Sequence, residues 1–197
     1  MNRVILTPAV LPPSALAELK QWLGVTTTRD DGPLSVLLAS ALETCEAFTG
    51  RMPLAAQCEE VLPAEAGWHA LSTRPVQAIT AIDGLGPDPI GTGTGSSSAS
   101  ERFPLPAGTA EIDLGADGGG RVRLSLPPDP TRSIVRIAVR FTAGLAEDWD
   151  HLPDGLRHGM IRLAAHQHRE RESEGAAALP PASVAALWRP WRRMRLR

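Results

Sequence analysis

The amino-acid sequence predicts an α+β fold: a core of three helices, a small antiparallel β domain inserted between the second and third helices, and an extended C-terminal arm. A contrast along the chain leads to this prediction. Apolar residues recur at helical spacing in about residues 14–23, 33–49 and 153–172, whereas residues 53–143 contain β-rich runs separated by glycine and proline. With 197 residues, of which 43% are hydrophobic, the chain is long enough to bury such a core.

Each predicted helix has one apolar face. In the first helix, Leu16, Leu19 and Leu23 recur at i, i+3 and i+7, and Gly24 follows as a stop signal. The second helix ends before Gly50, and its apolar face consists of Leu34, Leu37, Leu38, Ala41, Cys45 and Phe48. The third helix follows Pro153, and its apolar face consists of Leu152, Leu156, Met160, Leu163 and Ala164.

The inserted β domain is predicted from six runs of residues with high strand propensity. These runs are Gln57–Leu62, Trp68–Leu71, Val76–Ile82, Ala110–Leu114, Arg121–Leu126 and Ile134–Thr142. The last run alternates so that Val135, Ile137, Val139 and Phe141 share one face. Residues 86–108 include a Gly-Thr-Gly-Thr-Gly-Ser-Ser-Ser stretch that cannot bury apolar surface, so we expect a mobile loop there.

Charge is distributed unevenly along the chain. Residues 175–197 carry five arginines and no acidic residue, so a chain of net charge −2 has a body of net charge −7. A basic terminal arm on an acidic body is typical of a segment that docks on another molecule. We therefore divide the chain into an N-terminal helical part of the core (1–52), the β domain (53–143), the third core helix (144–174) and a basic C-terminal docking arm (175–197).

The docking arm combines large apolar groups with fixed positive charges. Tryptophan and arginine often dominate the energetics of protein interfaces, because they bring a large contact area or bidentate hydrogen bonds. We therefore predict that the arm docks into a partner protein. The predicted contact residues are Leu187, Trp188, Arg189, Trp191, Arg192, Arg193, Arg195 and Arg197. Nucleic-acid binding, with arginine on phosphates and tryptophan stacked on bases, remains the alternative.

The sequence predicts no enzyme, no cofactor and no metal site. His166 and His168 stand two residues apart and so point to different faces of a helix. The glycine-rich run 115–120 lacks the Lys-Ser/Thr pair of a phosphate-binding loop. Two cysteines, Cys45 and Cys58, are too few for a disulfide framework, and no apolar run approaches the roughly 18 residues that a membrane span needs.

Several short stretches, taken in order, resemble one family. They are Ala47–Arg51 at the end of the second helix, Arg74–Ile79 and Val139–Gly144 in the β domain, and Leu179–Pro181 with Leu187–Arg192 in the arm. In this order and spacing the chain is similar to the head–tail connector (adaptor) proteins of long-tailed bacteriophages and gene transfer agents. Phe141 and Trp191 stand where the family more often has tyrosine.

The resemblance implies a virion structural protein at the head–tail junction of a phage-like or gene transfer agent particle, made in the bacterial cytoplasm. Its partners would be copies of itself in a ring of twelve, the portal protein, contacted through the C-terminal arm, and a tail-side stopper or terminator protein. Double-stranded DNA would pass through the ring without sequence-specific binding, and an acidic lumen would repel its phosphates. No membrane partner is expected.

Overall fold

The computed structural model divides the chain into two compact units, and the predicted α+β class is confirmed. Met1–Pro8 and Ala56–Ala143 form one unit, here called the β unit. Ala9–Ala55 and Gly144–Arg197 form the other, here called the helical unit. The structure describes residues 3–87, 101–106, 108–125, 134–170 and 180–192.

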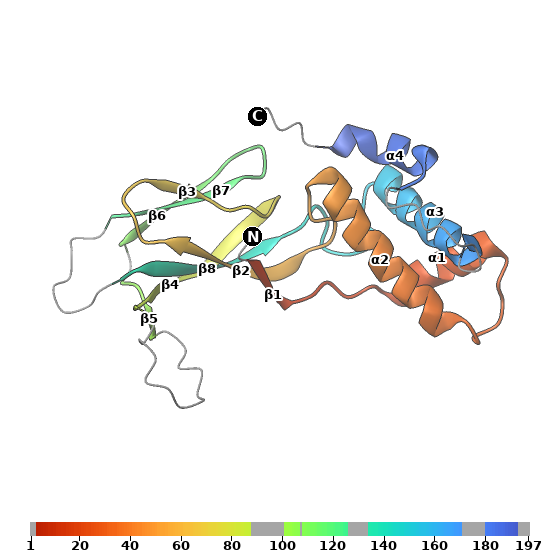
Figure 1. Ribbon diagram of the computed structural model, residues 1–197, viewed down its shortest axis with the longest axis horizontal. Helices are drawn as coiled ribbons and strands as arrows, with labels where there is room; N and C mark the ends of the chain where they lie inside the picture. Colours follow the sequence, from red (N-terminus) through yellow and green to blue (C-terminus); the bar gives the residue numbers. More distant parts are fainter. Residues whose placement is uncertain (1–2, 88–100, 107, 126–133, 171–179, 193–197) are drawn as a thin grey trace. The chain divides into compact units, whose positions relative to one another are not determined.

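Within the described residues, the helical unit contains four α-helices and one 3-10 turn (Figure 1). They are α1 (Pro13–Leu23), α2 (Asp31–Thr49), α3 (Asp154–Glu170), α4 (Ala182–Trp188) and η1 (Arg189–Trp191). The three long helices confirm the predicted ones to within a few residues. Gly24 and Gly50, both at positive φ, end α1 and α2, as the sequence predicts.

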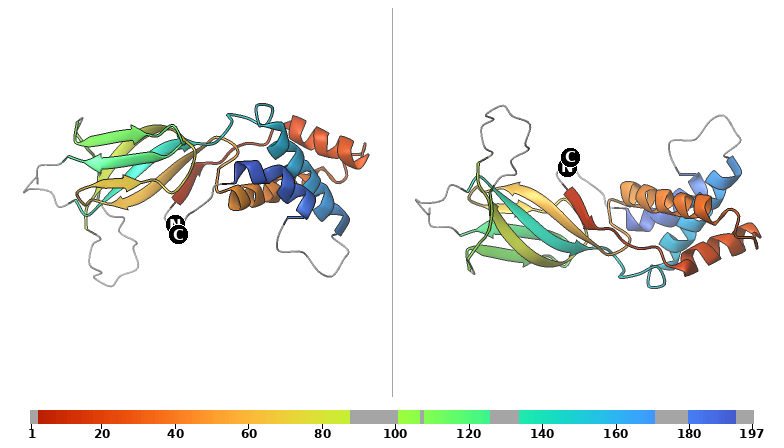
Figure 2. Two further views of the ribbon diagram at one scale, coloured as in Figure 1. Left: turned by 90° about the horizontal axis from the view of Figure 1, so that it is seen from above. Right: turned by 90° about the horizontal axis from the view of Figure 1, so that it is seen from below.

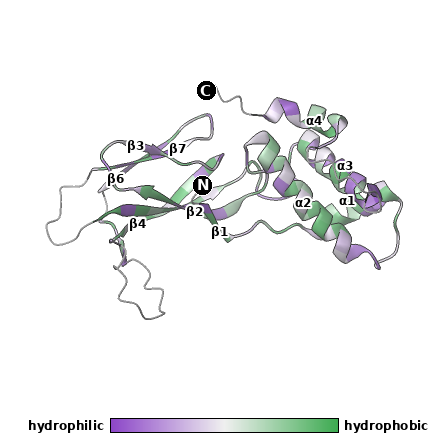
Figure 3. Ribbon diagram, viewed as in Figure 1, coloured by the Kyte–Doolittle hydropathy of each residue, from purple (hydrophilic) through white to green (hydrophobic). Residues whose placement is uncertain are grey.

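The core of the helical unit is built from the apolar faces of these helices. Figure 3 shows hydrophobic residues on the ribbons of α1 and α2. The fully buried side chains, each at most 1% exposed, include Leu19, Leu34, Leu38, Leu156 and Met160. Burying such a side chain contributes about 1.5–3 kcal/mol relative to exposure, so this cluster holds the unit together.

The described part of the β unit contains two antiparallel sheets (Figures 1 and 2). The five-stranded sheet has the order β1 (Arg3–Thr7), β2 (Ala56–Pro63), β8 (Arg136–Ala143), β4 (Val76–Leu85) and β5 (Arg102–Pro104). The three-stranded sheet has the order β3 (Trp68–Ala70), β7 (Gly120–Leu124) and β6 (Ala110–Leu114). All six predicted strands are present.

The central strand β8 has the buried face that its alternation predicts, except that Val135 lies before the strand and is 47% exposed. Ile137, Val139 and Phe141 are each at most 1% exposed. Its other face is partly covered: Ala138 is buried, and Arg140, 41% exposed, donates a hydrogen bond of 2.7 Å to the buried carboxylate of Asp83 on β4. The strand therefore has one fully buried face and one partly exposed face, as is common in antiparallel sheets.

Two strands differ from the sequence prediction. Residues 1–52 were assigned to the helical part of the core, but β1 pairs with β2 and belongs to the β unit. The run Val4-Ile5-Leu6 does not alternate between apolar and polar residues. In the structure all three side chains are exposed, so no buried face imposes such an alternation. The predicted loop 86–108 contains β5, which pairs with β4, and its residues 88–100 and 107 lie outside the described residues.

A buried carboxylate connects β2 to the turn before β4. Glu60, 4% exposed, accepts hydrogen bonds from the backbone N–H groups of Ser72 (2.8 Å) and Thr73 (2.9 Å). It also accepts hydrogen bonds from the hydroxyl groups of both residues, at 2.8 Å and 2.6 Å. A buried charge is stable where several donors surround it, so this turn is held by one side chain.

Candidate docking surface at the C-terminal segment

The C-terminal segment is fixed on the helical unit by α4. Val184 and Trp188, one turn apart on this helix, are 1% and 0% exposed and belong to the core of the unit. The indole Nε1 of Trp188 donates a hydrogen bond of 3.3 Å to the backbone oxygen of Leu156 on α3. Because its apolar body is buried and its polar atom is satisfied, Trp188 anchors the segment to its own chain.

Glycine residues on α3 make room for α4. A Cβ atom on Gly159 would overlap the indole nitrogen of Trp188 and lie 2.9 Å from its Cδ1 atom. One turn earlier, Gly155 faces the backbone oxygen of Leu187 and the indole nitrogen of Trp191, and there a Cβ atom would make ordinary contacts of 3.5 Å and 3.7 Å. The close approach of the indole to α3 therefore requires glycine at residue 159.

Replacing Gly159 with alanine is expected to destabilise the helical unit by about 1–3 kcal/mol, because the new methyl group displaces a rigid, buried indole. Gly155→Ala on the same helix is the matched control. It adds the same methyl group without a clash, so its effect should be neutral or stabilising by up to about 1 kcal/mol. Denaturant unfolding of the two purified variants measures the difference, and equal effects would contradict the assigned role of Gly159.

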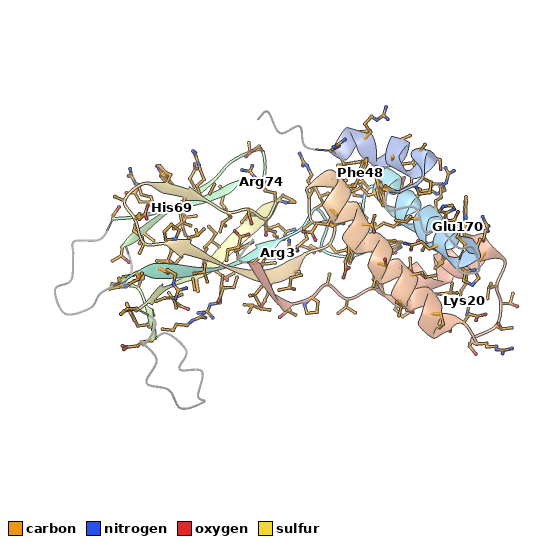
Figure 4. The ribbon with its side chains drawn as sticks, viewed as in Figure 1. Arg3, Lys20, Phe48, His69, Arg74 and Glu170 are labelled. Atoms are coloured by element: carbon orange, nitrogen blue, oxygen red, sulfur yellow. The ribbon has the colours of Figure 1, made fainter. Side chains whose placement is uncertain are left out.

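Phe48 connects the anchor to the surface. Its ring lies at the C-terminal end of α2 (Figure 4), 5.9 Å from the ring of Trp188. The guanidinium carbon of Arg192 lies 5.4 Å from the centroid of the same phenyl ring. This cation–π contact holds the Arg192 side chain against the helical unit.

The predicted contact residues fall into three groups. Trp188 is buried in the helical unit, and Leu187 is half-buried against the same core. Arg189 and Arg192 are exposed, and Trp191 is half-buried at the surface. The remaining three, Arg193, Arg195 and Arg197, lie outside the described residues. The described part of the docking arm therefore presents the cations of Arg189 and Arg192 and the edge of the Trp191 indole at the surface. Trp188 holds this part of the arm in place.

Titratable groups elsewhere in the helical unit form pairs. The His151 Nδ1 atom lies 2.7 Å from the Asp148 carboxylate at the surface, a hydrogen bond that raises the pKa of His151 and lowers that of Asp148. His166 lies 2.9 Å from Glu170.

Among the described residues, no group of three or more His, Cys, Asp or Glu side chains is arranged to hold a metal ion. Within the same residues no helix has the length and apolar character of a membrane span.

A surface groove of about 570 Å³ between α1 and α3 was not predicted from the sequence. Trp22, 45% exposed, forms one wall, and its ring meets that of His158 edge-on at a centroid distance of 5.1 Å. Arg157 lies within ion-pair distance of Glu18 and Asp154 at 3.8 Å and 3.1 Å. The one signal in the sequence for this groove was Trp22, a large apolar residue one position before the end of the amphipathic helix α1.

No protein-family model and no curated protein sequence matches the chain. Solved structures do match it. A chain in the neck of an empty gene transfer agent particle, computed with C6 symmetry, has a TM-score of 0.72 and 23% identity, covering 98% of this chain and 97% of that chain. A chain from the virion of a native gene transfer agent particle has a TM-score of 0.72 and 24% identity, with coverages of 100% and 97%.

A further neighbour comes from the neck of a native gene transfer agent particle computed with C12 symmetry. Its TM-score is 0.69 and its identity 25%, covering 98% of this chain and 97% of that chain. The location predicted from the sequence agrees with the part of the particle from which these neighbours come. Along its whole length, the chain has the fold of proteins found in the neck and virion of gene transfer agent particles.

Proposed function

We propose that the chain is a structural protein of the particle neck, a head–tail connector (adaptor) without catalytic activity. In this role, twelve copies form a ring beneath the portal protein, extend the DNA channel and offer a surface on which the tail-side stopper or terminator assembles. The observation that carries the proposal is the fold similarity to neck chains over nearly the full length of both proteins. The C6 and C12 symmetries of those necks support a ring.

The exposed residues of the C-terminal segment suit a contact with the portal protein. Trp188 fixes α4 to α3, and Arg192 is held against Phe48, so Arg189, Trp191 and Arg192 are presented on an ordered surface. A preorganised contact loses less side-chain freedom on binding than a free tail does. Repetition of one modest contact around a ring adds avidity. We therefore assign the portal contact to these residues and to the basic sequence that follows them.

A variant that ends after Arg192 and carries Arg189→Ala and Arg192→Ala tests the portal contact. It removes five cationic side chains but keeps Val184 and Trp188, so the core of the helical unit remains. We expect a folded protein, filled heads and few joined tails when this variant replaces the natural chain in producing cells. Electron microscopy of particles and DNA transfer to recipient cells measure the effect.

The control removes exposed arginines of the same unit elsewhere, with Arg29→Ala and Arg169→Ala, and should leave head–tail joining normal. If the truncated variant joins tails normally, the portal contact is wrong. If it also loses a salt-sensitive affinity for double-stranded DNA, the function is that of a DNA-binding accessory protein, because phosphate contacts weaken steeply with salt. Deleting residues 179–197 would be a poorer test, since it also removes Trp188 from the core.

A further inference from the structure

Strand β1 places three consecutive apolar side chains at the surface. Val4, Ile5 and Leu6 are 57%, 42% and 46% exposed. β1 is the last strand in the order of the five-stranded sheet and pairs with β2 alone among the described strands. An apolar edge strand is a site of association, and proteins that work as single copies protect such edges with charge, proline or very short strands.

The pairing of β1 with β2 accounts for the exposure of Leu6. Ile5 lies opposite Cys58 and Thr7 opposite Gln57, so Leu6 is an extra residue in a β-bulge. A bulge interrupts the alternation of side chains between the two faces of a sheet and redirects one of them. Leu6 is therefore exposed at the sheet edge between Ile5 and Thr7, while the regularly paired Val4 and Ile5 lie on opposite faces of the strand.

The opposite edge of the same sheet is protected. β5 has three residues and ends at Pro104, and Arg102 donates two hydrogen bonds, of 2.9 Å and 2.7 Å, to Glu59 on β2. Backbone hydrogen bonds join Gly86 to Glu101 and Ile82 to Leu105. Because the backbone groups of alternate residues point toward β4, those of Pro104 point away from it, toward the open edge. Proline has no N–H group there to pair with a further strand. Residues 4–6 of β1 contain neither a charge nor a proline.

The β unit has a second apolar surface at strand β6. Ile112 and Leu114 are 48% and 45% exposed. Beside Ile112, a groove of about 210 Å³ lies between β4 and β6. Its lining combines the apolar residues Ile79, Ile82, Leu105 and Ala110 with Thr80 and Thr109. Because an apolar cavity of about 150 Å³ accepts a benzene molecule, this groove is large enough for an aliphatic side chain.

The exposed tryptophan of the β unit is already in contact with its own chain. The guanidinium carbons of Arg121 and Arg123 lie 5.6 Å and 5.1 Å from the ring of Trp68. These arginines also form ion pairs with Asp113 and Glu111 on β6. This polar, charge-balanced face is a poorer match for β1 than the groove beside Ile112.

A ring with cyclic symmetry is built from head-to-tail contacts, so each copy must bring two different, complementary surfaces. We propose that β1 is one of them: the apolar edge of β1 in one copy, with Leu6 at its bulge, packs against Ile112, Leu114 and the β4–β6 groove of the next copy. This inference rests on the ring of the proposed function and names the contact that closes it. It assigns the β unit to assembly of the ring and leaves the C-terminal segment for the portal contact.

Cross-linking between copies in purified particles tests this contact. The variant carries Leu6→Cys together with Leu114→Cys and is treated with a short bis-maleimide. We expect a ladder of covalent multimers on a denaturing gel, because each copy is joined to the next. The natural cysteines do not interfere, since both are buried and burial raises the pKa of the Cys45 thiol to about 12.

The matched control pairs Leu6→Cys with Val135→Cys, which is 47% exposed in the same unit, and should give no ladder. Tailed particles that contain the protein without a ladder from Leu6→Cys/Leu114→Cys would overturn the β1 contact and leave the neck function standing. Dimers from Leu6→Cys alone would also overturn it, because β1 would then meet β1. If purified particles lack the protein, the neck function is wrong, and the proposed β1 contact is then wrong as well.

A charge at the edge gives an independent measurement. Leu6→Glu is expected to reduce the yield of tailed particles about tenfold relative to Val135→Glu, because the ring repeats the weakened contact at every copy. Thermal unfolding of both purified variants checks that the β unit is intact. Equal particle yields from two folded variants would contradict the proposal.

Discussion

Replacing Trp188 with alanine is expected to lower the free energy of unfolding of the helical unit by about 3–5 kcal/mol, the usual cost of removing a large aromatic side chain from a core. The indole is fully buried, and its removal would leave an empty space beside Gly159 and Phe48. It would also release the backbone oxygen of Leu156 from its hydrogen bond. Denaturant unfolding followed by far-UV circular dichroism measures the change.

The exposed Trp22 is the control for this prediction. Trp22→Ala removes the same kind of side chain from a half-exposed site, where it loses mainly the edge-on contact with His158, so it should cost only about 0.5–1.5 kcal/mol. A Trp188→Ala variant as stable as Trp22→Ala would show that α4 is not part of the helical core. Loss of head–tail joining in Trp188→Ala would then reflect a direct contact with a partner.

Replacing Glu60 with alanine is expected to destabilise the β unit by about 2–4 kcal/mol. The substitution leaves the buried N–H group and hydroxyl of Thr73 without their acceptor, and each unsatisfied buried donor costs about 1–3 kcal/mol. The N–H group and hydroxyl of Ser72, which is exposed, also lose their acceptor but can bond to water. Hydrogen exchange of the amides of β2 and β8, compared with those of α3, measures the loss in the β unit separately.

Two further variants decide whether the hydrogen bonds of Glu60 are the cause. Glu60→Gln keeps the volume and one oxygen acceptor, so it should lose less stability than Glu60→Ala. Glu65→Ala removes a carboxylate from an exposed position nearby and should leave the exchange rates unchanged. Equal protection of β2 in Glu60→Ala and Glu65→Ala would contradict the role assigned to the buried carboxylate.

The helices and most strands were predictable because their burial follows a simple period. Leu156, Met160 and Leu163 recur at helical spacing, and all three are buried on one face of α3. The alternation of Ile137, Val139 and Phe141 likewise matches the buried face of β8. In both elements the rest of the unit covers one face, so the spacing of apolar residues in the sequence indicates which face is buried.

β1 and β5 were not predictable in this way. The partner of β1 lies more than fifty residues away in sequence, and the exposure of Val4, Ile5 and Leu6 removes the period that would reveal a strand. β5 is only three residues long and ends in proline. Short edge strands take their conformation from the neighbour that they pair with, and a single sequence does not record that neighbour.

Part of the candidate docking surface was predictable from composition alone. The tryptophans and arginines of residues 188–192 marked a contact segment, but they did not tell which indole faces the segment's own chain. The spacing of Gly155 and Gly159, four residues apart on one helix, was a signal for this. Glycine is costly inside a helix, and two on one face point to another element that approaches closely.

The topology of the five-stranded sheet also affects how the protein folds as it is made. The central strand β8 leaves the ribosome after every other strand of its sheet, whereas β1 leaves first. In the same way, α1 and α2 are synthesised long before α3 and α4 supply the rest of their core. Neither unit can therefore complete its core while the chain is only partly synthesised. Until translation is nearly complete, the exposed apolar residues of β1 must be kept from associating with other nascent proteins.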